Sequence, residues 1–214
     1  MSDVNSLLAK YQNNNPTDIV NKMSASYLPY AGVANGLSAA VQSGMAKPGH
    51  WTLTANGGIK SLGVDVDAIP CFVHMKALRT GDSVESSLDP DSDVFKKIAS
   101  DAMGVNSGCM FGPEFLVYFP AEQQFATLFL GSKSGRRQAG AFTAMLGKSV
   151  KLNSELVKNA KGSWYVPKVA ESATPHVPFA EKDLDEAYAK YKGPVASKEA
   201  PVTPEAAEAA GRAR

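Results

Sequence analysis

The chain of 214 residues has two cysteines and no long apolar run. No hydrophobic stretch approaches the ~20 residues that a membrane-spanning helix needs. The first residues carry neither the basic region nor the apolar region of a secretory signal. Cys71 and Cys109 lack the spacing of a metal site, so we expect reduced thiols and a cytoplasmic protein. A single disulfide between these two cysteines stays an alternative.

Patterns typical of catalysis and of metal binding are also missing. The three histidines form no His-x-Glu or His-Glu-x-x-His arrangement, which argues against a zinc site. Asp89, Asp91 and Asp93 alternate, but the glycine and glutamate that complete a calcium loop do not follow, so we interpret this stretch as a solvated acidic loop. We therefore expect a protein that is not an enzyme and that uses no cofactor or metal.

The overall formal charge of +1 hides a strong segregation of charge along the chain. Between Leu130 and Lys168 there are eight basic residues and a single acidic residue, Glu155, which give this stretch a charge of +7. The rest of the chain carries −6. A chain of this kind can present a cationic face to a polyanion although it is not basic overall.

The most structured stretch lies between residues 115 and 148. Two apolar runs rich in aromatic residues, 115–119 and 125–130, flank a short polar connection and predict a buried hairpin. A basic loop follows at 131–137, and apolar residues at helical spacing predict a helix over 137–148. The loop superficially resembles a phosphate loop but lacks its residue order. The alternative to a binding role is an ordinary connecting loop whose charges are solvated.

Before the hairpin, residues 50–55 predict a strand, and residues 59–62 predict its partner after an Asn-Gly-Gly turn. Two longer elements follow. Residues 66–78 predict a long strand with apolar odd positions in the core and a partly exposed even face that carries Phe72, His74 and Lys76. Residues 93–103 predict a helix capped by Ser92 or Asp93.

Four stretches suggest a family: 50–60, 111–119, 125–137 and 164–168. In organisation and local sequence they resemble the single-stranded DNA-binding proteins of bacteriophages, over roughly residues 50–170. The fold that we expect is mainly β with short helices, an OB-like five-stranded barrel over residues 48–170. Residues 1–47 would form a helical or irregular segment. Residues 171–214 would form a flexible tail rich in proline and alanine, with a short helix predicted at 183–191.

The resemblance implies a non-catalytic protein of DNA replication or recombination, located in the host cytoplasm if it is viral. Its partners would be single-stranded DNA and, through the C-terminal tail, replication or recombination proteins; a homo-oligomer is compatible with it. Such proteins usually end in an acidic tail, whereas this sequence ends with Arg212 and Arg214. The alternative is a structural or assembly protein of a phage particle or of another self-assembling system.

The expected DNA-binding residues are cations for phosphates and aromatic rings for bases. The cations are Lys60, Lys76, Lys133, Arg136, Arg137, Lys148, Lys151 and Lys161. The rings are Trp51, Phe72, Trp164 and Tyr165, although buried tryptophans more often serve as core anchors.

Overall fold

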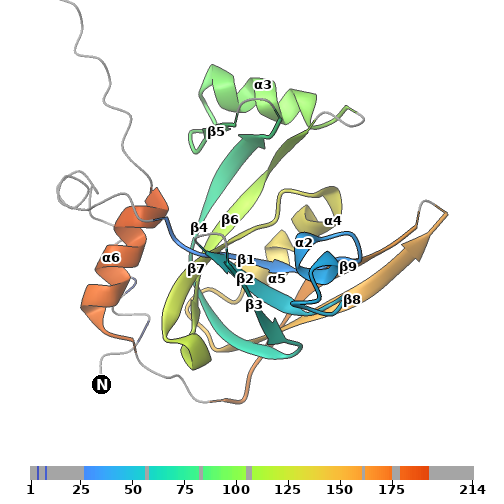
Figure 1. The fold of residues 1–214 in the computed structure, drawn as a ribbon. Coiled ribbons are helices and arrows are strands. Elements are labelled where there is room, and N and C mark those ends of the chain that lie inside the picture. Colours follow the sequence, from blue (N-terminus) through green and yellow to red (C-terminus); the bar gives the residue numbers. More distant parts are fainter. Residues whose placement is uncertain are drawn as a thin grey trace, which may run out of the picture.

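One mixed sheet holds most of the structure. The computed structural model describes Val4, Leu8 and residues 27–55, 58–81, 84–104, 108–160, 162–174 and 179–192. Eight strands follow the order β3-β2-β1-β7-β6-β4-β8-β9, and a ninth, β5, pairs with the far end of β4 (Figure 1). The strands are β1 Tyr30–Val33, β2 Trp51–Ala55, β3 Gly58–Gly63, β4 Val66–Arg79, β5 Glu85–Ser87, β6 Cys109–Phe119, β7 Gln124–Phe129, β8 Val150–Asn159 and β9 Gly162–Glu171.

The expected five-stranded OB-like barrel is wrong, because this sheet does not close. β3 and β9 are its two ends and do not pair with each other. β8 joins β4 only through Val66–Ala68, after which β8 and β9 leave the body as a two-stranded ribbon (Figure 1). On the outer edge of β9, the N–H of Tyr165 donates to the Asn35 side-chain oxygen at 2.6 Å rather than to another strand.

The predicted hairpin is confirmed as β6 and β7. Their antiparallel register runs from Glu114 opposite Phe129 to Phe119 opposite Gln124. A 3₁₀ turn over Pro120–Glu122 joins them, and Gln123 takes a left-handed conformation, with φ 50°, where the chain enters β7. Both faces of β6 are buried in this region, because the side chains alternate between two separate hydrophobic clusters.

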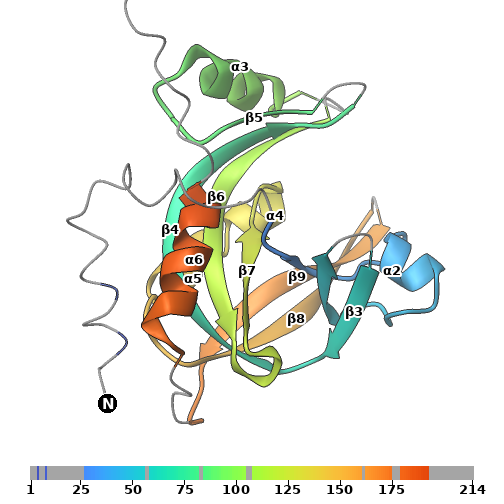
Figure 2. The ribbon, with the colours of Figure 1, turned by 60° about the vertical axis from the view of Figure 1, so that its left-hand side comes forward.

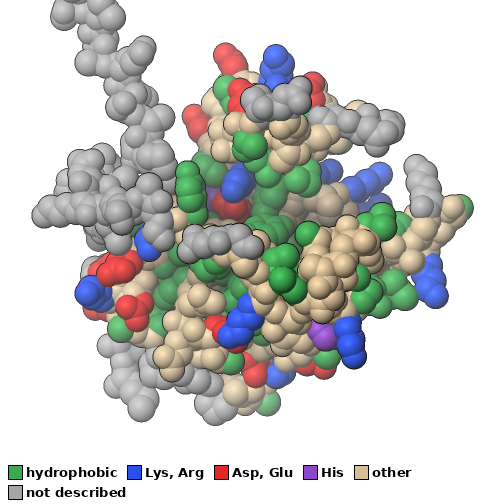
Figure 3. Space-filling model, in the orientation of Figure 1, with side chains coloured by type: hydrophobic (Ala, Val, Ile, Leu, Met, Phe, Trp, Pro, Cys, Tyr) green, Lys and Arg blue, Asp and Glu red, His purple; other side chains and the backbone are tan. Residues whose placement is uncertain are grey.

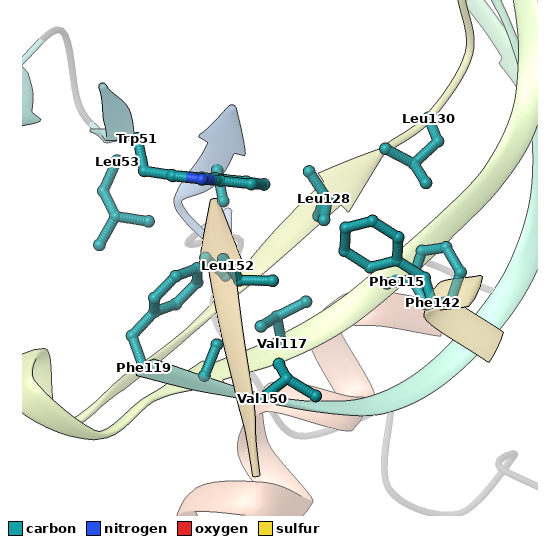
Figure 4. Close-up of a cluster of buried hydrophobic side chains, with 13 residues drawn as sticks. Trp51, Leu53, Phe115, Val117, Phe119, Leu128, Leu130, Phe142, Val150 and Leu152 are labelled. Carbon is teal, nitrogen blue, oxygen red and sulfur yellow. The ribbon is translucent and has the colours of Figure 1, made fainter. Parts of the chain in front are cut away.

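The first cluster lies between the curved sheet and the short helices α4 (Lys133–Arg136) and α5 (Ala139–Thr143). Figure 4 shows Phe115, Val117 and Phe119 of β6 grouped with Trp51 of β2, Leu128 of β7 and Leu152 of β8. Phe142 of α5 completes the cluster, with its ring 5.6 Å from that of Phe115. The single helix predicted over 137–148 is wrong in its extent, because two short helices span 133–136 and 139–143 instead. This segment includes Gly135 and Gly140, and glycine weakens helix interiors.

The second cluster lies on the opposite face of the sheet, under the helix α6 (Glu181–Lys192) (Figure 2). Leu184 and Tyr191 of α6 are buried there with Leu116 and Tyr118 of β6. The expectation of a flexible tail after residue 171 is therefore wrong for α6, whereas the short helix predicted at 183–191 within that tail is confirmed. The expectation of a helical or irregular segment before residue 48 misses β1, which pairs parallel to β7.

β4 departs from the simple alternation that its sequence predicts. A bulge between Pro70 and Phe72 shifts its register against β6, so Ile69 and Cys71 belong to the cluster under α6 while Val73 packs on the other cluster. A bulge adds one residue to one strand and thereby exchanges the two faces beyond it. The expected exposed even face is instead covered: Phe72 contacts Tyr188 of α6 at 4.6 Å between ring centroids.

A small lobe forms where β4 and β6 extend beyond the rest of the sheet. The helix α3 (Asp93–Asp101) packs Phe95 and Ile98 on Ala77 of β4. Ser92 caps α3 by accepting a hydrogen bond from the N–H of Phe95 at 3.2 Å, which confirms the predicted helix start. A further short helix, α2 (Ala39–Gln42), follows β1. Within the described residues, no helix combines the length and the apolar character that crossing a membrane requires.

Candidate nucleic-acid interface

The basic loop is a rigid turn between β7 and α5. Ser132 caps α4 by accepting a hydrogen bond from the N–H of Gly135 at 3.0 Å. A side chain at Gly135 would come within 3.3 Å of the Leu130 backbone, so glycine lets the turn close tightly. The buried Phe142 anchors the following helix in the core. The charged side chains of this loop therefore start from a fixed backbone.

Three of the predicted cations reach solvent without a carboxylate partner. Lys133, Arg137 and Lys148 are exposed, and no ion pair joins them to any part of the chain that the structure describes. In the space-filling view, basic side chains gather between the α3 lobe and the ribbon of β8 and β9, beside the position of α4 (Figure 3). An exposed cation without a partner keeps its full charge for a polyanion.

Arg136 behaves differently from its neighbours. Its Nη1 donates to the backbone oxygens of Gly131 at 2.6 Å and of Phe111 at 3.0 Å. The guanidinium carbon lies 4.2 Å from the centroid of the Phe111 ring, a cation–π distance. Arg136 is thus half-buried and tied to the β6 strand rather than extended into solvent.

The other predicted cations are neutralised by neighbouring acids or are not placed. Lys60 forms an ion pair with Glu122. Lys76 contacts Glu114 at 2.7 Å, and Lys151 contacts Asp67 at 2.8 Å. Lys161 lies outside the described residues.

Two of the predicted aromatic residues are covered by the protein, and two are half-buried on β9. Trp51 has an exposed fraction of 0% and is a core residue, and Phe72 lies under α6. Trp164 and Tyr165 are half-buried on β9. The ring of Tyr165 lies against Gly49, where an added Cβ would come within 2.6 Å of it. Because α4 packs against β9, the strand that carries Trp164 adjoins the basic turn.

A polar cluster around Glu114 is the feature that sequence reasoning missed. Its carboxylate accepts hydrogen bonds from His74 Nε2 at 2.9 Å and from Lys76 Nζ at 2.7 Å. Tyr191 of α6 donates to the Glu114 backbone oxygen at 2.5 Å and stacks on His74, with 4.0 Å between ring centroids. An acidic residue within the apolar run 111–119 was the available signal, because a buried carboxylate requires partners.

Burial and charge act in opposite directions on Glu114. Burial alone would raise the pKa of this carboxyl, but the hydrogen bond from His74 and the positive charge of Lys76 outweigh it, so the pKa lies below its usual range. The same carboxylate, together with burial, raises the pKa of Tyr30 on β1. His74 Nδ1 is buried and makes no hydrogen bond with the described residues. This cluster ties α6 to the sheet rather than forming an open site.

The two cysteines and the acidic loop lie in separate local environments. Cys71 and Cys109 do not form a disulfide. Burial raises the pKa of the Cys71 thiol far above its usual range, which suppresses the reactive thiolate. Asp89 accepts a hydrogen bond from the Asp91 N–H at 3.0 Å, a turn that leads into the α3 cap. No group of three or more potential metal ligands occurs among the described residues.

Comparisons with protein-family models, with curated proteins and with solved structures found no match. The functional interpretation of the chain therefore rests on the geometry and charge of the basic turn and of the strand beside it.

Proposed function

We propose that this protein binds single-stranded DNA without catalysing a reaction, through the surface formed by α4, the α5 connection and β9. The observation that carries the proposal is a set of three exposed cations without carboxylate partners: Lys133 and Arg137 on the turn between β7 and α5, and Lys148 between α5 and β8. Each would neutralise a phosphate and release counterions. The charge of +7 between Leu130 and Lys168 supports the same surface.

Base contacts would come from β9 in this proposal. Trp164 is half-buried, so one part of its indole can offer a stacking surface while the rest packs on the protein. Base–aromatic stacking contributes roughly 1–3 kcal/mol per base and tolerates any sequence. Binding without sequence preference suits a protein of DNA replication or recombination. A location in the host cytoplasm, partner proteins held by the C-terminal tail and a homo-oligomer belong to the same proposal.

The test measures the affinity for fluorescent oligo-dT at several salt concentrations. Replacing Lys133, Arg137 and Lys148 by glutamine should lower the slope of log affinity against log salt by about 2, since each single-strand phosphate contributes about 0.7. The matched control replaces Lys96, Lys97 and Lys182, which lie on α3 and α6, and changes the total charge equally. The control should keep the parent slope.

Equal slopes for the two triple variants would contradict the proposed surface. Wild-type protein that fails to bind oligo-dT at low salt would contradict DNA binding itself. Duplex DNA and RNA of the same length serve as competitors. A large assembly that forms without nucleic acid, seen by sedimentation velocity, would favour the alternative role as a structural or assembly protein.

A further inference from the structure

Arg136 is held more rigidly than any other cation of the basic turn. Its Nη1 group uses two backbone acceptors on two different segments, Gly131 before α4 and Phe111 on β6. The Phe111 ring supports the guanidinium plane at 4.2 Å. The Cγ of Arg136 also packs closely on β6, where a Cβ added to Gly112 would come within 3.1 Å of it. Stem and head of the side chain are therefore both fixed.

These contacts leave one edge of the guanidinium unused. The two Nη1 contacts account for both hydrogens of that nitrogen. Nε and Nη2 make no hydrogen bond with the described residues, and neither atom is completely buried without a partner. The Nε–Nη2 edge carries two parallel N–H groups, the fork that binds a carboxylate or phosphate in a bidentate manner.

We propose that Arg136 is a preorganised phosphate-binding residue, which holds one backbone phosphate of the DNA strand through its Nε–Nη2 edge. This inference rests on the proposed function and adds a fixed point to it. Lys133 and Arg137 contribute charge from mobile side chains, whereas Arg136 sets where a phosphate sits relative to β6 and β9. A guanidinium that is already ordered loses less conformational entropy on binding than a solvated one.

The competing interpretation is that Arg136 only stabilises the turn. Two charge-conserving variants separate these roles: R136K removes the fork, and R79K makes the same change in the α3 lobe, where Arg79 forms ion pairs with Glu85 and Asp101. With oligo-dT at one salt concentration, R136K should weaken binding by about ten- to hundredfold, since one hydrogen bond to a charged group is worth about 1.5–3 kcal/mol. R79K should change the affinity less than about twofold, because Arg79 lies outside the proposed surface and lysine keeps its charge.

Wild-type protein supplies a readout that does not depend on a variant. The Nε–H resonance of Arg136, assigned in a ¹⁵N spectrum with R136K, is followed while inorganic phosphate is added and, separately, while oligo-dT is added. We expect it to shift in both titrations and to shift before that of Arg137. A merely structural arginine would keep its resonance while exposed cations respond.

The outcomes separate the inference from the proposed function. If oligo-dT binds but R136K equals R79K and the Arg136 resonance stays unchanged, Arg136 only stabilises the turn and the inference fails while the DNA-binding proposal survives. If phosphate shifts the Arg136 resonance but oligo-dT does not bind, the anion site stands and the DNA-binding proposal fails. If phosphate leaves the Arg136 resonance unchanged and oligo-dT does not bind, both are overturned. Backbone spectra of R136K that match the parent outside the turn exclude unfolding as the cause.

Discussion

Replacing Glu114 by glutamine tests whether the buried polar cluster stabilises the docking of α6 on the sheet. The side chain has an exposed fraction of 5%, and its two oxygens accept one hydrogen bond each from His74 and Lys76. Glutamine keeps the shape but offers one acceptor oxygen instead of two. The variant therefore loses one charge-assisted hydrogen bond and leaves Lys76, whose side chain is three-quarters covered, without a counter-charge.

The expected loss is large for a single isosteric change. A hydrogen bond to a charged group contributes about 1.5–3 kcal/mol, and removing one partner of a buried ion pair costs about 3–5 kcal/mol. Because Lys76 keeps partial contact with solvent, we expect Glu114→Gln to lower the free energy of unfolding by about 2–3 kcal/mol. Urea denaturation followed by the fluorescence of the tryptophans, one of which is the buried Trp51, measures it.

The effect should depend on pH in a defined direction. The pKa of Glu114 is lower in the folded protein than its unfolded value of about 4.3, so the unfolded chain binds the proton more readily. The carboxylate therefore stabilises the fold above this pH, and the contribution disappears as the pH falls through the folded pKa. The difference between parent and Glu114→Gln should be full at neutral pH and shrink below about pH 4.3.

An exposed ion pair supplies the control. Asp67 and Lys151 are 2.8 Å apart, and each side chain is about one-third exposed. Asp67→Asn should change the free energy of unfolding by no more than about 1 kcal/mol. A triple variant that makes the cluster apolar, Glu114→Leu with His74→Phe and Lys76→Met, should recover most of the loss, because no buried charge remains. A Glu114→Gln protein as stable as the parent at neutral pH would refute the reasoning.

Two other changes test the capping of α3 and the approach of the basic turn to β6. Ser92→Ala removes the acceptor for the Phe95 N–H and should destabilise the protein by about 1 kcal/mol, read from thermal unfolding; an unchanged melting temperature would contradict the cap. Gly112→Ala places a Cβ within 2.5 Å of the Leu130 carbonyl oxygen and should destabilise by about 1–3 kcal/mol, with weaker oligo-dT binding. Parent-like stability and affinity would show that the turn adjusts freely.

The parts of the fold that sequence predicts well are those fixed by neighbouring residues. Alternation and aromatic content locate the hairpin of β6 and β7, and Ser92 marks the start of α3. β1 is four residues long, contains Gly32, and is ordered by pairing with β2 and β7, which are far away in the chain. The bulge in β4 likewise cannot be predicted from the local sequence, because it arises from pairing with β6. These long-range pairings explain why the expected barrel is wrong.

The same limit applies to the candidate site. Local charge density predicts the basic turn as the site, and the structure places Lys133 and Arg137 in solvent there and Lys148 in solvent after α5. Whether a lysine is paired depends on acids distant in sequence: Glu122 is 62 positions from Lys60, and Glu114 is 38 positions from Lys76. The docking of α6 determines the burial of Phe72, and the pattern of residues within β4 does not predict that a helix lies over it.

The way β9 ends the sheet has a consequence for the protein at high concentration. Tyr165 directs its N–H away from β8 and toward Asn35, so residue 167, two positions further along the strand, faces the same outer edge. That residue is a proline, which has no N–H to offer. Two successive donor positions are thus closed to an incoming strand. Copies crowded together would therefore resist edge-to-edge aggregation through this part of β9.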